Sequence, residues 1–450
     1  MDYFLDGGWI TMTKRNKNSP YPIFEKTLSE AFTPEYLRQT AKDTGLIKRE
    51  RKIDPVAIFW VLTLSFGVGM QRTLASLKRN YEREGKTTLS DSSWYERFSP
   101  ELVLFLKHCV IHGIEYVAKK EHRKLSDKLV HFEDVLIQDS TIIRLHKKLA
   151  KIWPAARTRK VAAGVKVSLL VSAVANSVKS VSVFGERRSE IKTLRIGPWI
   201  KDRILLIDLG FYKHQLFKRI EENGGYFVSR LKDTADPLIV SVNGSYRGNS
   251  IDVVGKHLSE VLPKLKREIL DAEVEITINR REYRGKKHKE PARFRMVAIY
   301  NKETKRYHIY ITNISMEILE AEEIASLYGA RWEIELIFKE LKGRYKLDVI
   351  QNRNPEVVEA LIWVAMLTLL ASRLIYNVVR EMGEAQGKEA VRFTSLRWSN
   401  IFSENAKDLL SSLLDYLNVK MDLMDYYNLY TGQAFDPHVK RHRFREEWWS

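Results

Sequence analysis

The spacing of hydrophobic and polar positions along the chain predicts helices first, then strands, then helices again. Residues 25–120 have apolar positions at helical intervals. Four residues in this region have the character of helix caps, most of them directly before a proline: Thr33, Asp54, Ser90 and Ser99. Two apolar runs, residues 56–69 and 361–371, are shorter than the ~20 residues that a membrane-spanning helix needs, so we expect both to be buried helices.

Strand patterns begin after residue 130. Three apolar runs, residues 135–143, 164–174 and 179–184, follow one another without an intervening helix. An antiparallel meander has this order, because each strand returns directly alongside the one before it. The pattern therefore predicts three neighbouring antiparallel strands.

The next segment alternates between helix and strand. Residues 189–199 predict a short helix and residues 203–208 a fourth strand, which ends on an acid. A helix at 211–222 and a fifth strand at 224–230 follow. Strands that alternate with helices are typical of an α/β sheet.

The second half of the chain changes pattern twice. Short alternating runs separated by basic turns predict a mostly β segment, after which we expect a helix at 322–345 and an apolar one at 355–380. The expected fold class is α/β, with helical regions at both ends of the chain. The expected regions are a helical N-terminal domain (1–130), the first part of a core (131–232), a mostly β insertion (233–318), the second part of the core (319–380) and a helical C-terminal region (381–450).

The helix expected at 322–345 has a polar stripe. At about 100° per residue, Tyr328, Arg331, Glu335 and Lys342 fall within roughly a 60° arc. Because apolar residues border this arc, the stripe could line a site. Arg331 and Glu335 could equally form an ordinary exposed ion pair of the i, i+4 kind. The helix alone leaves both interpretations open.

Two aspartates upstream stand where carboxylates are unusual. Asp139 interrupts an apolar strand, where an unpaired carboxylate is costly to bury. Asp208 ends a hydrophobic strand, where α/β sheets tend to place functional groups. With Glu335 they could hold divalent metals through oxygen, and two such ions can activate a water or a 3′-hydroxyl for attack on a phosphodiester. Each acid alone could equally be a structural ion pair. Neighbouring acids also compete for the role: Glu133, Asp134 and Asp202.

Composition points to an anionic partner. The chain has 450 residues, with 75 Lys and Arg against 57 Asp and Glu, and a net charge of +18. An excess of this size favours nucleic acid, with a membrane surface as the less favoured partner. The N-terminal helical domain could hold DNA phosphates through a basic segment, or its charge could merely be solvated. That segment contains Lys78, Arg79, Arg83 and Lys86. The single Cys109 excludes an intramolecular disulfide and a cysteine-rich zinc site.

Three motifs together resemble a known enzyme family. The pattern Tyr328-x2-Arg331-x3-Glu335-x6-Lys342 resembles the signature of DDE transposases of the insertion-sequence four family. Asp139-Ser140-Thr141 is similar to the first acidic motif of that family, and Asp208-Leu209-Gly210-Phe211-Tyr212 to the second. The spacings also fit, with 69 residues from Asp139 to Asp208 and 127 more to Glu335.

The resemblance implies an RNase H-like catalytic core interrupted by the β insertion, with an N-terminal domain that binds terminal inverted repeats. It implies that Asp139, Asp208 and Glu335 are ligands for two Mg²⁺ or Mn²⁺ ions. It further implies that three residues grip the DNA near the cleaved end: Tyr328, Arg331 and Lys342. Cleavage and strand transfer by cut-and-paste, acting as a homodimer on double-stranded DNA, complete the expectation.

One departure concerns the hairpin intermediate that some related enzymes form, in which a flipped base stacks on a tryptophan of the insertion. The chain has no tryptophan between Trp199 and Trp332, so a stacking residue would have to be another aromatic, for example Tyr283, Phe294 or Tyr300. The chain begins without a basic segment before an apolar core, so we expect no signal peptide, no membrane partner and a cytoplasmic, nucleoid-associated protein. Two alternatives remain: a non-catalytic DNA-binding protein derived from a transposase, and an RNase H-type nuclease that cuts without joining.

Overall fold

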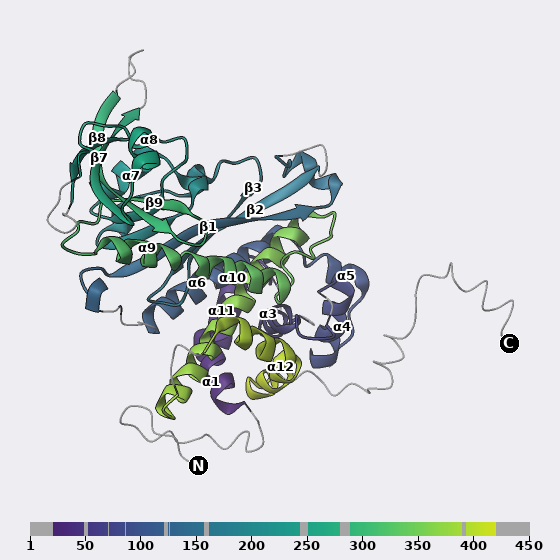
Figure 1. Cartoon of the computed structure of the whole chain (residues 1–450). Helices are drawn as coiled ribbons and strands as arrows, with labels where there is room; N and C mark the ends of the chain where they lie inside the picture. The colour runs from purple at the N-terminus through teal and green to yellow at the C-terminus, as the bar shows by residue number, and fades with distance from the viewer. Residues whose placement is uncertain are drawn as a thin grey trace, which may run out of the picture. The chain divides into compact units, whose positions relative to one another are not determined.

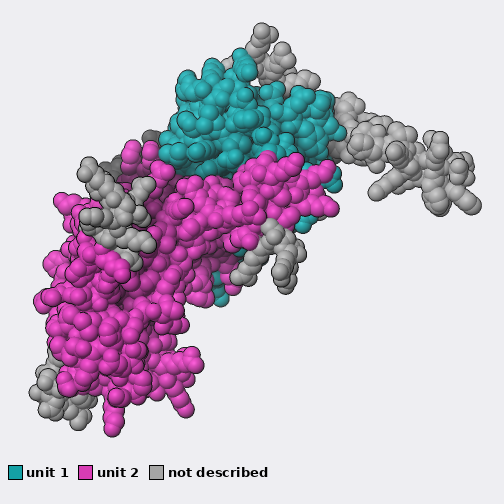
Figure 2. Space-filling model, turned by 90° about the horizontal axis from the view of Figure 1, so that it is seen from above, with its two compact units in different colours: residues 1–113, 340–450 teal, residues 114–339 magenta. Residues whose placement is uncertain are grey.

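The chain folds into two compact units. The structure is a computed structural model, and it describes residues 21–48, 53–70, 72–85, 87–120, 125, 127–156, 162–243, 251–279, 289–388 and 393–419. Unit 1 comprises residues 1–113 and 340–450, and unit 2 comprises residues 114–339 (Figure 2). Helices build the described part of unit 1, and a large sheet with helices on it builds unit 2 (Figure 1). The protein is therefore a mixed α/β protein with helical ends, as expected. The five regions expected from the sequence are a finer division and stay a prediction.

Unit 1 is organised around one short apolar helix. All ten residues of α3 (Pro55–Leu64) are buried, which leaves this helix without a solvent face. It is enclosed by helices from both ends of the chain: α2 (Pro34–Asp43), α4 (Leu74–Gly85), α11 (Pro355–Ala385) and α12 (Ser395–Tyr416). The other helices that begin in unit 1 are α1 (Pro22–Ala31), α5 (Asp91–Tyr95) and α6 (Pro100–Lys120).

The expected caps begin helices in unit 1. The Thr33 hydroxyl accepts a hydrogen bond from the Tyr36 amide at the start of α2 (3.2 Å), and the Asp54 carboxylate accepts one from the Val56 amide at the start of α3 (2.7 Å). Ser90 caps α5 in the same way, and α6 begins at Pro100, directly after Ser99. These starts are predictable because the capping side chain and the amide it satisfies are neighbours in sequence.

Both apolar runs contain buried helices, as expected, but the first helix, α3, ends at Leu64, and Val68 near the end of that run is exposed. The 361–371 run lies in α11, whose length and mean hydropathy of 1.8 alone would allow it to cross a membrane. However, 94% of its most apolar window is buried inside the protein. α11 is therefore a core helix of unit 1, against which α1 and α3 pack.

The basic segment of α4 is partly neutralised within unit 1. The Lys78 ammonium lies 2.7 Å from the Asp91 carboxylate and 3.6 Å from that of Glu82. Arg83 pairs with Glu84 at 2.7 Å. Lys86 lies outside the described residues. At least two of the three described cations of this segment thus already have partners in the fold, and DNA binding by this segment stays a prediction.

The described residues of unit 2 form one sheet of nine strands, in the order β3-β2-β1-β4-β5-β9-β8-β7-β6. The first three strands form the expected antiparallel meander, and β4 and β5 continue from β1 in parallel. The strands of this half are β1 (Asp134–Leu145), β2 (Ala163–Ser172), β3 (Ser177–Gly185), β4 (Arg203–Ile207) and β5 (Tyr226–Arg230).

The expected β insertion continues the same sheet. β9 pairs antiparallel with β5, and β8, β7 and β6 follow outward. The sequence predicted three of these strands and missed β6, which is only five residues long and half exposed. The strands of this half are β6 (Leu238–Val242), β7 (Ile269–Asn279), β8 (Lys289–Asn301) and β9 (Arg306–Thr312). A short helix, α8 (Leu258–Val261), stands between β6 and β7.

Helices pack on both faces of this sheet. α7 (His214–Glu222) covers one face, where Phe217 stacks on Phe227 of β5 with ring centroids 4.4 Å apart and also contacts Phe294 of β8. α9 (Ala321–Gly329) covers the other face, where its Tyr328 contacts Tyr310 of β9. Tyr310 pairs with Val297 of β8, and Val297 is an odd number of residues from Phe294. Because side chains alternate along a strand, Val297 and Tyr310 face away from the side that Phe294 faces. We call these the α7 face and the α9 face.

Burial removes one of the three aromatic candidates for base stacking. Phe294 is 2% exposed and sits in the core on the α7 face, so its ring is not available to a DNA base. Tyr300 is half-buried against Tyr307, with ring centroids 5.2 Å apart. Tyr283 lies outside the described residues.

Two expected helices are shorter or different in the structure. Residues 189–199 form two 3₁₀ turns, η3 (Glu190–Thr193) and η4 (Pro198–Ile200), rather than one helix. Gly197 is extended and Pro198 lacks an amide hydrogen, so a helix does not continue through them. The helix predicted at 211–222 begins only at His214, after the turn η5 (Leu209–Phe211).

The helix predicted at 322–345 is two helices. α9 ends at Gly329 and α10 (Trp332–Gly343) begins after a tight turn at Ala330 and Arg331. The amides of Ala330 and Arg331 bond to carbonyls three residues back instead of four, both at 3.0 Å. Glycine at the end of α9 weakens the helix where the turn forms. The polar stripe is therefore bent at Arg331.

Candidate active site

Asp139 and Asp208 lie side by side because their strands are parallel. Gln138 of β1 pairs with Ile207 of β4, and each aspartate is the next residue along. The Gln138 side chain shares the α7 face with Leu170, its partner on β2, and with Ile207. Asp139, one residue on, points to the α9 face. Asp208 follows the end of β4, with extended backbone.

The Arg331 guanidinium lies among all three expected carboxylates. Its nitrogens are 2.6 Å from Glu335 Oε1, 3.7 Å from Asp139 Oδ2 and 3.9 Å from Asp208 Oδ1. Arg331 itself is 16% exposed, and Asp139 is 19% exposed. The structure therefore brings together these four of the six residues singled out from the sequence, and a fifth, Tyr328, lies next to Arg331.

The two interpretations of the Arg331–Glu335 pair turn out to be compatible. The pair exists, at the spacing of an ordinary helical ion pair. However, the same guanidinium also stands within 4 Å of two strand aspartates, so one cation faces three acids. An ordinary surface pair has equal numbers of both charges. The excess of carboxylates makes this a place that attracts further positive charge.

Tyr328 lies beneath Arg331. The guanidinium carbon is 5.9 Å from the centre of the tyrosine ring, and the ring also packs on Tyr310. The side chain is 8% exposed, and burial raises the pKa of its hydroxyl to about 12. Lys342 lies in the last turn of α10, within the part of the chain assigned to unit 1.

Burial raises the pKa of Asp139 to about 6, and the charges of Asp208 and Glu190 act in the same direction. Two groups oppose the shift: the Ser140 amide, which donates to Asp139 Oδ1 at 2.7 Å, and Arg331. A carboxylate taken out of water among other acids is stabilised in its charged form by a nearby cation.

The competing acids have structural roles. Asp134 accepts hydrogen bonds from the Ser172 hydroxyl at 2.6 Å and the Val174 amide at 3.1 Å, which hold β1 to the end of β2. Glu133 pairs with Arg203 at the start of β4. Asp202 is in a turn with φ of 55°. None of these three is among the acids that surround Arg331.

Sequence reasoning missed Glu190, a fourth acid beside the site. Its carboxylate accepts a hydrogen bond from the Ser140 hydroxyl at 2.6 Å, and it lies 3.8 Å from the Lys166 ammonium. It also fills the space beside Gly210, where an added Cβ would be 2.0 Å from Glu190 Oε2. Glu190 thus holds the strand segment that follows Asp139 against the turn that follows Asp208. The only sequence signal was the glycine two residues after Asp208.

The donor set suits a hard divalent cation. Three carboxylates converge on one position of positive charge, and Mg²⁺ and Mn²⁺ prefer oxygen ligands of this kind. With Arg331 between them, no three His, Cys, Asp or Glu side chains in the described ranges are close enough together to share one ion. The chemistry of Asp139, Asp208 and Glu335 therefore suits such a cation, and in this structure the Arg331 guanidinium is the positive charge among them.

Comparison with known proteins places the site within a matched segment. The profile of a family described as "Transposase DDE domain" matches residues 130–371. The transposase for insertion sequence element IS1151 of Clostridium perfringens is 24% identical over 412 residues, which cover 84% of this chain and 86% of that protein. The transposase for IS231F of Bacillus thuringiensis subsp. israelensis is 22% identical over 406 residues, 83% of this chain and 84% of its own. A putative transposase of Escherichia coli (strain K12), InsL for IS186A, is 33% identical over 86 residues, 19% of this chain and 22% of its own.

Proposed function

Because the chain belongs to the family of transposases with a DDE domain, which catalyse metal-dependent DNA cleavage and strand transfer, we propose that it moves an insertion sequence. We assign the metal-binding role to Asp139, Asp208 and Glu335. The observation that carries this assignment is the convergence of all three carboxylates on the Arg331 guanidinium.

The sheet supports an RNase H-like core. In that fold, an antiparallel meander of three strands is extended by parallel strands next to the first strand, and β3-β2-β1-β4-β5 has this order. Asp139, in the middle of β1, is then next to Asp208, which follows the end of β4, and α10 brings Glu335 to them. β6–β9 are then an insertion that extends the core sheet.

Two Mg²⁺ or Mn²⁺ ions held by these carboxylates would activate the attacking water or 3′-hydroxyl and stabilise the leaving oxygen. The protein residues fix the geometry: Asp139 and Asp208 by strand pairing, and Glu335 by its helix. When the carboxylates are engaged, the Arg331 guanidinium is released from them and can bind a DNA phosphate with two hydrogen bonds. We propose Tyr328 and Lys342 as the other two residues that hold the cleaved end.

The remaining steps follow from the family. We propose that the protein binds the terminal inverted repeats of its element and acts as a homodimer on two paired ends, by cut-and-paste. Whether a hairpin forms depends on a stacking aromatic other than Phe294, which the core buries. A DNA-acting enzyme of this kind would work in the cytoplasm, associated with the nucleoid.

The first test is cleavage of a duplex that carries the terminal repeats found beside this reading frame. With Mg²⁺ or Mn²⁺ the wild-type protein should nick the repeat ends, and the Asp208→Ala variant should not. Normal nicking by Asp208→Ala would refute the metal assignment. If the wild type neither nicks nor binds either ion, the non-catalytic alternative is favoured. A pre-cleaved 3′-hydroxyl end that is not joined to target DNA would instead indicate a nuclease.

A further inference from the structure

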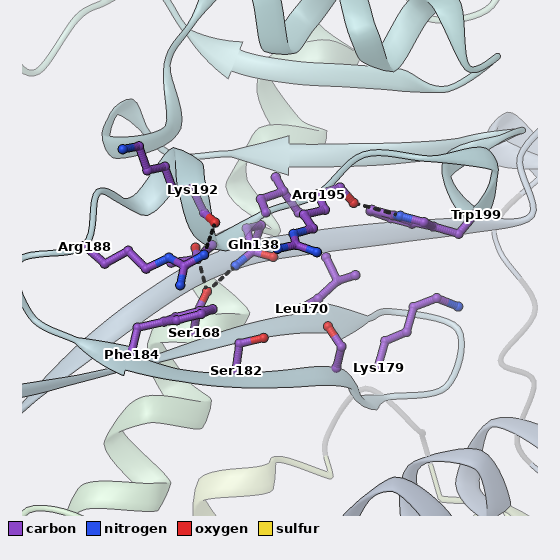
Figure 3. Close-up of a pocket in the computed structure, with 13 residues that line it drawn as sticks. Gln138, Ser168, Leu170, Lys179, Ser182, Phe184, Arg188, Lys192, Arg195 and Trp199 are labelled. Atoms are coloured by element: carbon purple, nitrogen blue, oxygen red, sulfur yellow. Dashed lines mark hydrogen bonds between the residues drawn. The ribbon is translucent and has the colours of Figure 1, made fainter.

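A pocket of about 520 Å³ opens on the α7 face of the meander (Figure 3). Its floor includes Gln138 of β1, the residue before Asp139, and Ser168 and Leu170 of β2. β3 forms one side, and the 3₁₀ segment from Glu190 to Ile200 forms the other. The pocket therefore adjoins the candidate active site along β1 but faces the opposite side of the sheet from the Asp139 carboxylate.

The floor of the pocket is held by a chain of hydrogen bonds. The Gln138 amide donates to the Ser168 hydroxyl at 2.8 Å, and this hydroxyl donates to Thr193 at 3.2 Å. The Thr193 hydroxyl in turn donates to the Glu190 carbonyl at 2.6 Å. These bonds tie the 3₁₀ segment to the sheet, so the pocket has a fixed shape.

The walls carry four cations and no acid. The cations are Lys179, Arg188, Lys192 and Arg195, and none of the residues that line the pocket is Asp or Glu. Within the described part of the chain, none of the four forms an ion pair. Like charges gathered without counter-charges repel one another, and an anion bound among them would relieve that repulsion.

Two aromatic rings stand among these cations. The Arg188 guanidinium lies 4.2 Å from the centre of the Phe184 ring, which fixes it over one wall. The Trp199 indole donates to the Arg195 carbonyl at 3.0 Å, which orients its ring. In Figure 3 the ends of Arg188 and Arg195 point toward Gln138, and Trp199 stands at the other end of the pocket.

Cations beside an aromatic ring suit a ligand that carries both a negative charge and a flat ring. An unpaired nucleotide offers a phosphate for the guanidinium groups and a base for stacking. The volume lies in the range of pockets that hold small molecules, whereas a DNA duplex is too wide to enter. We propose that this pocket binds one unpaired nucleotide of a DNA strand, with its phosphate between Arg188 and Arg195 and its base on Trp199. The proposal rests on the proposed function only in taking DNA as the source of the nucleotide.

The experiment measures binding of the full-length protein to a fluorescent single-stranded 12-mer and to a duplex of the same sequence. The test variants are Arg188→Ala/Arg195→Ala and Trp199→Ala. The matched control is Lys264→Ala/Lys266→Ala, which removes two exposed lysines elsewhere in unit 2. Melting temperatures of the arginine and lysine variants should equal that of the wild type, because the substituted cations are exposed. Trp199 is partly buried against the core, so Trp199→Ala is compared with Trp199→Phe, and the melting temperatures of both are measured to separate a loss of stacking from a loss of stability.

We expect the double arginine variant to bind the 12-mer about 10-fold more weakly and to lower the slope of log K against log salt by about 1, as for one or two lost phosphate contacts. Trp199→Ala should weaken binding by about 5- to 100-fold, and Trp199→Phe should recover most of the loss, because a ring remains for stacking. Duplex affinity should change no more than in the lysine control. Equal loss in the lysine control, or unchanged 12-mer binding in both test variants, would overturn the proposal.

Competition identifies the ligand. Deoxyadenosine monophosphate should displace the 12-mer from the wild-type protein. It should not displace the 12-mer that still binds to the double arginine variant. Inorganic phosphate at the same concentration should not displace the 12-mer from the wild-type protein. Equal displacement by inorganic phosphate would reduce the site to a plain anion site and refute the nucleotide. Failure of the proposed function can be distinguished from failure of this inference. If the protein binds the 12-mer through this pocket but nicks no repeat end, nucleotide binding by the pocket stands and the transposase activity is refuted.

Discussion

The two halves of α10 each contribute a glutamate to an arginine–glutamate pair, and the two pairs have the same distance but opposite surroundings. Glu335 meets Arg331 at 2.6 Å, and Glu340 meets Arg373 of α11 at 2.6 Å. The Glu340 and Arg373 side chains are 0% and 2% exposed, and the Tyr345 hydroxyl donates to Glu340 at 2.5 Å. At Glu335, by contrast, one arginine faces three carboxylates that are partly open to solvent.

The balance of charge differs between the two pairs, and it distinguishes a structural ion pair from a candidate catalytic site. In the Glu340 pair each charge has one opposite charge, and the Tyr345 hydroxyl, whose proton goes to Glu340, accepts a hydrogen bond from the Ser372 hydroxyl at 2.7 Å. The buried network is therefore matched. The acids around Arg331 outnumber their cation, and the site would gain from additional positive charge. The distance between the opposite charges is 2.6 Å in both pairs, so it does not distinguish them. The balance of charge and the access of water distinguish a site from a core pair.

The largest expected effect is a loss of DNA nicking when the solvent-accessible Arg331–Glu335 pair is changed. Glu335→Ala should reduce nicking of repeat ends by about 10³-fold or more, because it removes one member of a set that acts as a unit. The free energy of unfolding should change little, because the substitution removes one of three carboxylates that share a single arginine. Glu333→Ala, an exposed acid two residues earlier on α10, is the control and should nick normally. If both variants lose activity alike, Glu335 has no special role.

At the buried Glu340–Arg373 pair we expect a large loss of stability instead. Glu340→Ala should lower the free energy of unfolding by about 3–5 kcal/mol, because it leaves Arg373 charged and without its partner in the core. Urea denaturation measures this change. Replacing both partners, as in Glu340→Met with Arg373→Leu, should cost clearly less, because no charge is left buried. An equally large loss in the double variant would mean that packing, and not charge, sets the cost.

An intermediate effect is expected where Glu190 fills the space beside Gly210. Gly210→Ala should displace the Glu190 carboxylate and break its bond to Ser140, at a cost of about 1–2 kcal/mol. It should also weaken binding of Mn²⁺, measured by titration, because Ser140 adjoins Asp139. In a Glu190→Ala background the same glycine substitution should have almost no further effect on either quantity. Additive effects would show that the two residues do not interact.

The smallest change in stability is expected at Arg331. Arg331→Ala should lower the stability of the metal-free protein by about 1 kcal/mol, as for a partly exposed pair, because three carboxylates are left to repel one another. The rise in melting temperature on adding Mg²⁺ or Mn²⁺ should become larger than in the wild type, since the ions no longer compete with the guanidinium. A Lys302→Ala variant, which breaks an exposed pair with Glu268, should show no change in the metal effect.

The sequence determined what depends on neighbouring residues. The caps at Thr33 and Asp54, the meander and the α11 core helix follow from contacts within one turn or from continuous apolar runs. The two aspartates could be singled out because a carboxylate in or directly after an apolar strand conflicts with its surroundings. For the same reason, the motif residues on α9 and α10 stood out as polar positions bordered by apolar ones.

Only the tertiary structure decided how distant segments combine. β9 pairs with β5, so the insertion extends the core sheet, and no local pattern specifies that pairing. Glu340 and Glu335 both lie on α10, yet one is buried with an arginine of α11 and the other faces two strand aspartates. Glu190 reaches Gly210 across 20 residues of chain. The physical reason is shared: the energy of a charge depends on which charges and how much water surround it, and both are set by residues far away in the sequence.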